Sequence, residues 1–342
     1  MKNIAIINAV DISAYGLEKL NEVVSSFDKV LEYAAGLADV GKILILCGTD
    51  FPKDAARGYN TKPGDNWNVA ALLDCLAAES SGYDHMFYFF GDTPFLDPEK
   101  TGEMYEKHIK YLVQYSFADG YPAGLTPEIL RSDCLPSIAQ LAKDMAKPIK
   151  RDSVFEAIKM DINAFDIETD IAARDQRMLR VALAADTRRN FMLLKKIAAS
   201  GEQTLQKACD FLEAEPETLR TLPAYFLIQT NGGCPQACSY CPWPDAGGNV
   251  LSRSDEMSAG KFLEIAAKAH DFAGDATIGL SLWGEPAFHS EISPMVRGIS
   301  AFDGLSCLVE TSGIGWRPGV IEEIIRETDH RLEWIVSLDA LE

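Results

Sequence analysis

A run of three cysteines placed directly after a short strand constrains the fold of this chain more than any other feature. Residues 224–230 are an apolar stretch that predicts a β-strand, and a pair of glycines ends it. Cys234, Cys238 and Cys241 follow at a spacing that lets three thiolates hold three irons of a cubane cluster, which leaves the fourth iron open. Because the loops at the C-terminal ends of barrel strands build active sites, this pattern predicts a catalytic metal loop in a β/α barrel.

The same thiols leave a second interpretation open. A zinc knuckle completed by a distant ligand, such as Cys307 or His270, is compatible with the spacing. Zinc sites favour two separated pairs of ligands over a run of three cysteines, so the spacing favours the iron–sulfur interpretation. The other cysteines are scattered singly in apolar or helical patterns, and we expect buried thiols without a function at positions 47, 75, 134, 209 and 307.

Strands alternate with helices after the cysteine loop. Together with residues 224–230, the segments 276–282, 305–310 and 332–338 predict four strands, with helices over 258–272, 292–299 and 318–328 between them. Right-handed crossovers would curl such a repeat into part of a barrel. The chain stops just past the fourth strand, and an uncovered parallel edge predicts a product truncated at its C-terminus.

The cysteine loop and the strand ends that follow it resemble the radical S-adenosylmethionine (SAM) enzymes, in particular a spirochaete-type group of the SPASM class. The resemblance implies a 4Fe-4S cluster on the three cysteines, with SAM on the open iron and Tyr240 beside its adenine. It also implies reductive cleavage of SAM to a radical, an electron donor for the cluster, and a peptide or protein as the kind of substrate modified. The reaction belongs to the cofactor, while the protein supplies position and shielding.

Two later segments extend this resemblance. Gly284 and Glu285 end the second strand where the family has a Gly-Gly-Glu segment, which implies binding of the methionyl ammonium, although Trp283 replaces the first glycine. A carboxylate has a physical reason to be there, since it pairs with a cation. Ser337 in the fourth strand matches a serine that contacts the ribose or carboxylate of the cofactor in SPASM-type members.

The first half of the chain predicts a different α/β domain. Apolar strands near residues 3–8, 42–47 and 85–90 alternate with helical segments, which is typical of a Rossmann-like parallel sheet covered on both faces. The strand at 85–90 is followed by Gly-Asp-x-Pro, so Asp92 comes at a strand end, where ligands of such sheets bind. This half resembles the nucleotidyltransferase (GT-A-like) fold of sugar-nucleotide synthases, which implies that Asp92 helps to bind a metal ion and a nucleotide.

One departure from that family concerns the loop after the first strand. The family has a glycine-rich loop with a basic residue there, whereas residues 8–16 contain one glycine, one added carboxylate and no arginine. Backbone amides approach phosphates closely only where glycine permits it, so triphosphate binding is not expected.

A second acidic segment is a candidate metal site. Asp166 and Glu168 alternate with Asp170, so in a strand the three carboxylates would share one face and could chelate a divalent ion with Asp92. A solvated strand face is the alternative. Residues 172–199 have helical periodicity and many arginines, which predicts a salt-bridged, solvated helix that includes Asp175 and Asp186.

These patterns predict two domains joined by a linker. We expect an α/β nucleotidyltransferase-like domain over 1–200, a helical linker over 201–221 and the partial barrel over 222–342. The net charge of −19 opposes binding to nucleic acid, and no apolar stretch is long enough to span a membrane, so we expect a cytoplasmic protein.

Three functions follow. The first is a radical SAM enzyme acting on an unknown substrate. The alternative is a nucleotidyltransferase or sugar-nucleotide-binding protein that acts through the N-terminal domain. The third is not enzymatic: the N-terminal domain would be a docking module that presents a substrate to the barrel.

Overall fold

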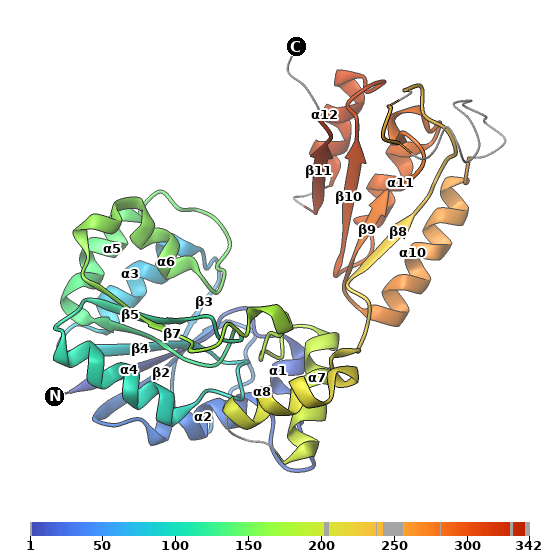
Figure 1. Cartoon of the computed structure of the whole chain (residues 1–342). Coiled ribbons are helices and arrows are strands. Elements are labelled where there is room, and N and C mark those ends of the chain that lie inside the picture. The colour runs from blue at the N-terminus through green and yellow to red at the C-terminus, as the bar shows by residue number, and fades with distance from the viewer. Residues whose placement is uncertain are drawn as a thin grey trace. The chain divides into compact units, whose positions relative to one another are not determined.

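The computed structural model describes residues 2–201, 205–236, 238–241, 256–280, 282–328 and 331–338. The chain divides into two compact units, Met1–Thr221 and Leu222–Glu342 (Figure 1). Each unit has its own sheet and its own buried apolar core. The α/β class predicted from the alternating strands and helices is confirmed.

The first unit is built on a seven-stranded, mostly parallel sheet in the order β3-β2-β1-β4-β6-β5-β7. Only β6 runs antiparallel to its neighbours. The strands are β1 (Asn3–Ala9), β2 (Val40–Gly48), β3 (Asn60–Gly64), β4 (His85–Phe90), β5 (Tyr115–Asp119), β6 (Glu128–Arg131) and β7 (Ile167–Ile171).

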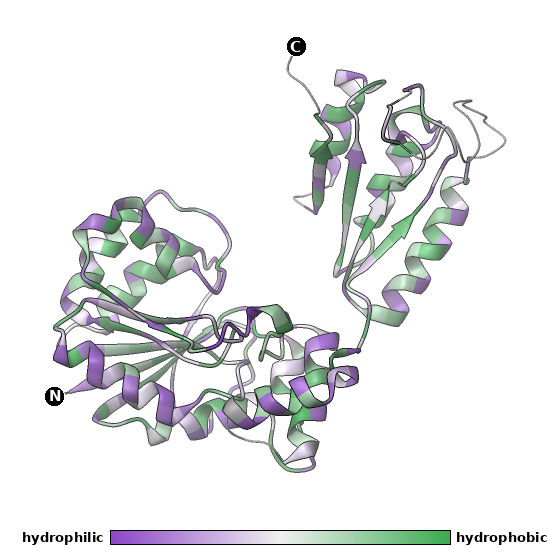
Figure 2. Ribbon diagram, viewed as in Figure 1, coloured by the Kyte–Doolittle hydropathy of each residue, from purple (hydrophilic) through white to green (hydrophobic). Residues whose placement is uncertain are grey.

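Helices cover both faces of this sheet, because its central strands are apolar on both sides. Every residue of β1 is buried. Ile4 and Ile6 face one core, and Ala5 and Ile7 face the other, as the alternation of side chains along a strand requires. The first core is completed by α3 (Val69–Glu79), α5 (Leu135–Leu141) and α6 (Ser153–Ile158), and the second by α2 (Ser26–Gly36) and α4 (Pro98–Lys110). Figure 2 shows apolar strands and helices with one apolar side.

A third cluster of apolar side chains lies around α7 (Arg188–Ser200) and α8 (Leu205–Ala214). Ala208, Cys209 and Leu212 of α8 are buried in it, so most of the segment expected to be a linker packs within the first unit. The helix expected over 172–199 was wrong in its first half. Residues 172–187 contain only one short 3-10 turn, Arg177–Leu179, and α7 starts at Arg188, where Thr187 caps its N-terminus.

The second unit is a four-stranded parallel sheet in the order β11-β10-β9-β8. It consists of β8 (Tyr225–Ile228), β9 (Ala276–Leu280), β10 (Leu305–Thr311) and β11 (Leu332–Val336), with α10 (Ala259–Ala273), α11 (Ile292–Ile299) and α12 (Pro318–Glu327) between them. The four expected strands are therefore present, and closure into a barrel stays a prediction. None of the described helices combines the length and the apolar character needed to cross a bilayer.

Candidate functional site

A cavity of about 180 Å³ lies where β1 and β4 end. Strand β1 contributes Asn8 and β4 contributes Phe90, and the loops beyond them supply several charged side chains. The complete lining is Asn8, Asp11, Ile12, Phe90, Asp92, Ile149, Lys150, Arg151 and Asp186. Of the sequence-predicted site residues, Asp92 alone lies here.

The turn after β4 holds Asp92 almost fully buried. The Gly91 N–H donates to the Asn8 carbonyl oxygen at 2.8 Å, and the Thr93 hydroxyl donates to the Phe90 carbonyl oxygen at 2.7 Å. A side chain at Gly91 would come within 2.9 Å of the Phe27 ring, so only glycine fits. Asp92 is consequently fixed by the turn at the edge of the cavity.

Arg151 binds the Asp92 carboxylate with both ends of its guanidinium. Nη1 donates to Oδ1 at 3.1 Å and Nη2 donates to Oδ2 at 2.6 Å, which is the bidentate geometry of a strong charge-assisted pair. The guanidinium carbon lies 4.9 Å from the centroid of the Phe90 ring. Burial lowers the pKa of Arg151, but the carboxylates of Asp92 and Asp186 outweigh burial and raise the pKa overall. The guanidinium is therefore charged at every pH at which the protein is folded.

Asp186 is the second carboxylate on Arg151, and the sequence analysis missed its role. Its Oδ2 accepts from Nη2 of Arg151 at 3.2 Å, and its Oδ1 accepts from the Asn190 side-chain amide at 2.8 Å. Backbone bonds bring it there, because the Ala185 N–H donates to the Asp92 carbonyl oxygen at 2.8 Å. The Ser13 hydroxyl also donates to the Ala185 carbonyl oxygen, at 2.6 Å. The strand-like pairing of residues 181–185 replaces the helix that the periodicity predicted.

The loop after β1 does not form an open cradle of backbone amides. It folds into one helical turn, α1 (Ala14–Leu17), capped by Ser13. Its single glycine, Gly16, serves close packing, since a Cβ there would lie 2.7 Å from Ile12 Cγ1 and 3.4 Å from Asp92 Cβ. The glycine of this loop is therefore used for packing and not for an approach of the backbone to a ligand.

The metal ion implied at Asp92 by the resemblance to nucleotidyltransferases does not fit the residues present. Each carboxylate oxygen of Asp92 and Asp186 already accepts a hydrogen bond from Arg151 or Asn190, and the Arg151 guanidinium stands between the two carboxylates, where a divalent cation would bind. Within the part of the chain that the structure describes, no three His, Cys, Asp or Glu residues are grouped so as to hold a metal ion.

The acidic residues of β7 lie elsewhere. β7 runs parallel to β4 with β6 and β5 between them, so Asp166 and Glu168 at the start of β7 are at the opposite end of the sheet from Asp92, which follows the end of β4. The structure does not bring them together. Their neighbour Asp170 is buried, and its carboxylate pairs with Lys107 Nζ at 2.5 Å and Lys100 Nζ at 3.3 Å.

A second cavity, of about 300 Å³, shares Arg151 with the first and extends to β5 and β6. Glu128 lines it together with four aromatic residues. The Tyr115 hydroxyl donates to Oε1 of Glu128, while Oε2 is buried without a hydrogen-bond partner. Burial raises the pKa of Glu128 to about 7.

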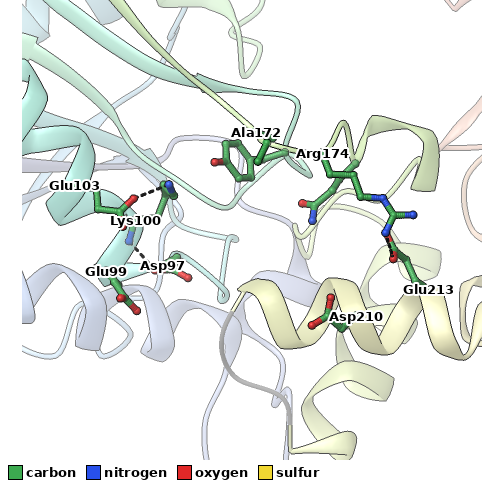
Figure 3. Close-up of a pocket in the computed structure, with 11 residues that line it drawn as sticks. Asp97, Glu99, Lys100, Glu103, Ala172, Arg174, Asp210 and Glu213 are labelled. Atoms are coloured by element: carbon green, nitrogen blue, oxygen red, sulfur yellow. Dashed lines mark hydrogen bonds and ion pairs between the residues drawn. The ribbon is translucent and has the colours of Figure 1, made fainter.

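A third cavity, of about 410 Å³, is rich in charged side chains that already have partners. Figure 3 shows Glu103 beside Lys100 and, across the cavity, Arg174 beside Glu213. The nitrogen–oxygen distance is 2.6 Å in each pair. Both cations of this cavity are paired with carboxylates of its wall, whereas the Asp92 cavity has in Lys150 a lysine without an ion pair among the described side chains.

In the second unit, the three cysteines do not form a metal centre. Cys234, Cys238 and Cys241 are free and partly exposed, and the described residues contain no metal-holding group. Burial raises the pKa of the Cys234 thiol, which disfavours the thiolate that ligation requires. The predicted 4Fe-4S cluster is therefore wrong, and the same finding speaks against the zinc alternative with Cys307 or His270.

Glu285 has a structural role that the sequence did not suggest. It is buried, and its carboxylate accepts from the Ser312 N–H at 2.9 Å, the Ser312 hydroxyl at 2.8 Å and the Thr311 hydroxyl. Gly284 pairs with Gly233, and a Cβ on Gly284 would lie 2.3 Å from the Asn231 carbonyl oxygen. These contacts tie together the loops that follow β8, β9 and β10.

The other two residues predicted to bind SAM are exposed. The Tyr240 residue is 68% exposed, and Ser337 lies just beyond β11 with its N–H bonded to the Thr311 carbonyl oxygen at 2.8 Å. The sequence predicted SAM binding only on an iron of the cluster, with contacts from Tyr240, Ser337 and the Gly284–Glu285 turn. Because the cluster prediction is wrong, the prediction of SAM binding is wrong as well.

No family model matches this chain. An uncharacterised protein of Treponema pallidum (strain Nichols) is 33% identical to it over 196 residues, which are 55% of this chain and 53% of that protein. The chain thus spans a little over half the length of the curated relatives it matches.

Many solved structures are similar to the chain, among them the following two. A cytidylyltransferase from Leptospira borgpetersenii serovar Hardjo-bovis superposes with a TM-score of 0.55 at 16% identity, covering 66% of this chain and all of that one. The CMP:2-keto-3-deoxy-manno-octonic acid synthetase complexed with CTP gives a TM-score of 0.44 at 14% identity, covering 59% and 100%.

The likeness to the Leptospira protein confirms the predicted nucleotidyltransferase-like fold. The prediction of a radical SAM enzyme with a 4Fe-4S cluster and SAM as cofactors is wrong, because the fold likeness is to cytidylyltransferases and the described residues hold no metal group.

Proposed function

We propose that the protein is a nucleotidyltransferase-type enzyme whose first unit binds a cytidine nucleotide at the Asp92 cavity. The observation that carries this proposal is the place of the cavity in the sheet. The strand order β3-β2-β1 reverses at β1, with β4 on its other side, and ligands of open α/β sheets bind outside the carboxyl ends of the strands at such a switch point. Asn8 and Phe90 line the cavity from those two strand ends.

The cations at this point suit a phosphate group. Lys150 is exposed and has no ion pair among the described side chains, so its ammonium is available to an anionic ligand. Arg151 uses three hydrogen bonds on carboxylates out of the five N–H donors of a guanidinium. Cationic groups of this kind bind phosphates and stabilise a transferring phosphoryl group.

The choice of a cytidine nucleotide comes from the fold relatives. The Leptospira structure is of a cytidylyltransferase, and its whole length is covered by this chain. Because the loop after β1 lacks a glycine cradle, we expect the α-phosphate to dominate recognition, so that CMP binds about as tightly as CTP.

Nucleotide-dependent protection tests the proposal. Thermal melting of the whole chain with CMP, CTP, UMP and GMP should show an upward shift for the cytidine nucleotides, because a ligand that binds only the folded state stabilises it. In the Lys150→Ala variant, at least ten times more nucleotide should be needed to reach the same melting shift. The control is Lys143→Ala, which removes another exposed lysine of the same segment that does not line the cavity. This variant should show the same melting shift as wild type.

A second experiment tests the reaction class. It measures the release of pyrophosphate from CTP with 3-deoxy sugar acids as acceptors. Equal shifts for all four nucleotides, or none for any of them, would contradict the proposed specificity.

A further inference from the structure

We infer that Arg151 takes the place of a divalent cation in the first unit: its guanidinium is a built-in counterion for Asp92 and Asp186. The consequence, that the cavity binds its ligand without a metal ion, rests on the proposed function.

The side chains of Asp92 and Asp186 converge on one point. Asp92 follows β4 and Asp186 precedes α7, so two carboxylates separated by 94 positions meet at one point. Two like charges this close are stable only with a cation between them. The cation is Arg151, at 2.6 Å from Asp92 Oδ2 and 3.2 Å from Asp186 Oδ2.

In this arrangement the guanidinium occupies the position between the two carboxylates that a metal ion would take. Mg²⁺ requires oxygens at about 2.0–2.1 Å in near-octahedral geometry. Both oxygens of Asp92 are directed at the guanidinium, and the oxygen of Asp186 that does not bind Arg151 is bonded to Asn190. Arg151 would have to leave before a metal ion could enter.

Arg151 is held in place by the residues around it. Its side chain is only 31% exposed, and its guanidinium lies against the Phe90 ring. The backbone beside it is anchored, because the Lys150 N–H donates to the Ser153 hydroxyl at 2.7 Å, at the start of α6. A planar fork with two bonds to one carboxylate is more rigid than a lysine ammonium would be.

Charge counting gives the consequence for ligand binding. A divalent cation would neutralise Asp92 and Asp186, whereas Arg151 supplies one positive charge and Lys150, on the same cavity, supplies the second; Asp11 is a third carboxylate of the lining that this count leaves unpaired with either cation. The protein thus carries in its own side chains the charge that a metal ion would bring to this point.

Manganese binding to the whole chain without nucleotide tests the inference, with the EPR signal of free Mn²⁺ as readout. Wild type should show only weak binding over its acidic surface, and Asp92→Asn should leave that binding unchanged. Arg151→Gln should gain one site at least tenfold tighter, and Arg151→Gln combined with Asp92→Asn should lose it. Arg174→Gln, which removes a surface arginine paired with Glu213, is the control and should match wild type.

Two results would overturn the inference. One is a Mn²⁺ site in wild type that Asp92→Asn removes. The other is a folded Arg151→Gln variant, checked by circular dichroism, that gains no site. Should that variant not fold, the comparison of wild type with Asp92→Asn still decides.

A nucleotide arm separates this inference from the proposed function. Protection by CMP should be the same in EDTA and in excess Mg²⁺. Protection that requires Mg²⁺ would overturn the inference and leave the proposed function standing. Protection in neither buffer would count against the proposed function, while the Mn²⁺ measurements decide the inference on their own.

Discussion

Replacing Glu128 by glutamine should change how the stability of the first unit depends on pH. In the folded protein the pKa of Glu128 is about 7, because burial disfavours its charged form. In the unfolded chain the same carboxyl titrates near its ordinary value of about 4.5. The folded state therefore binds the proton more strongly, so stability is fully present below about pH 4.5 and is lost as the pH rises towards 7.

The size of the effect follows from these two values. Each pKa unit corresponds to about 1.36 kcal/mol. Relative to low pH, the stability lost through ionisation of Glu128, expressed in pKa units, is roughly 0.6 at pH 5 and roughly 2.5 at pH 8. Ionisation of Glu128 should thus cost about 2–3 kcal/mol between pH 5 and pH 8. The glutamine variant keeps an acceptor for the Tyr115 hydroxyl and has no charge to bury, so it avoids this loss.

Urea denaturation of wild type and Glu128→Gln at pH 5 and pH 8 measures the difference. The free energy of unfolding of the variant, relative to wild type, should rise by about 2–3 kcal/mol between the two pH values. Glu106→Gln, at an exposed position of α4, reports the general effect of removing one negative charge. A difference that stays constant from pH 5 to pH 8 would refute the reasoning.

Three further predictions concern other parts of the molecule. Arg151→Gln should lower the free energy of unfolding in urea by about 2–3 kcal/mol, because it leaves the Asp92 carboxylate buried without its cation, and adding Asp92→Asn should recover about half of this loss. Burial lowers the pKa of His108 to about 3, so the unfolded chain binds the extra proton and wild type should lose stability as the pH falls below about 6.5; His108→Gln should flatten that limb in a pH series of melting curves. Gly284→Ala should lower the melting temperature of the second unit, since its Cβ would lie 2.3 Å from a backbone oxygen, whereas Gly260→Ala in α10 has open space and should raise it slightly.

The sequence predicted the sheet strands that are apolar and missed those that are not. β1 and β4 are continuous apolar runs, and both were placed within one residue of their observed ends. β3 has the sequence Asn-Thr-Lys-Pro-Gly, and β6 is four residues long with a polar residue at each end, so neither has a periodicity to detect. What places them is pairing with other strands, β3 with β2 and β6 with β4, which no local pattern encodes.

The candidate site was predictable only where its signal was local. Asp92 was found because a strand and its turn are contiguous in sequence. Arg151 lies 59 positions from Asp92 and 35 from Asp186, and no pattern in the sequence links residues at such separations. A backbone pairing of residues 181–185, which overrides their helical periodicity, brings the third member to the site.

The cysteine motif shows the converse error. Its spacing permits three thiolates to converge, but spacing does not decide whether the backbone turns them towards one point. In the structure the three side chains form no metal-holding group. Glu285, which was expected to bind the cofactor, instead holds neighbouring loops together.

Hydrogen–deuterium exchange with and without CMP tests the central claim most directly, because it shows where the nucleotide binds. We predict slower exchange in peptides that contain residues 90–93, 149–152 and 183–187, which surround the Asp92 cavity, and the same pattern in EDTA as in Mg²⁺. Unchanged exchange at saturating CMP, or protection confined to the second unit or to the cavity beside Lys100, would contradict the account.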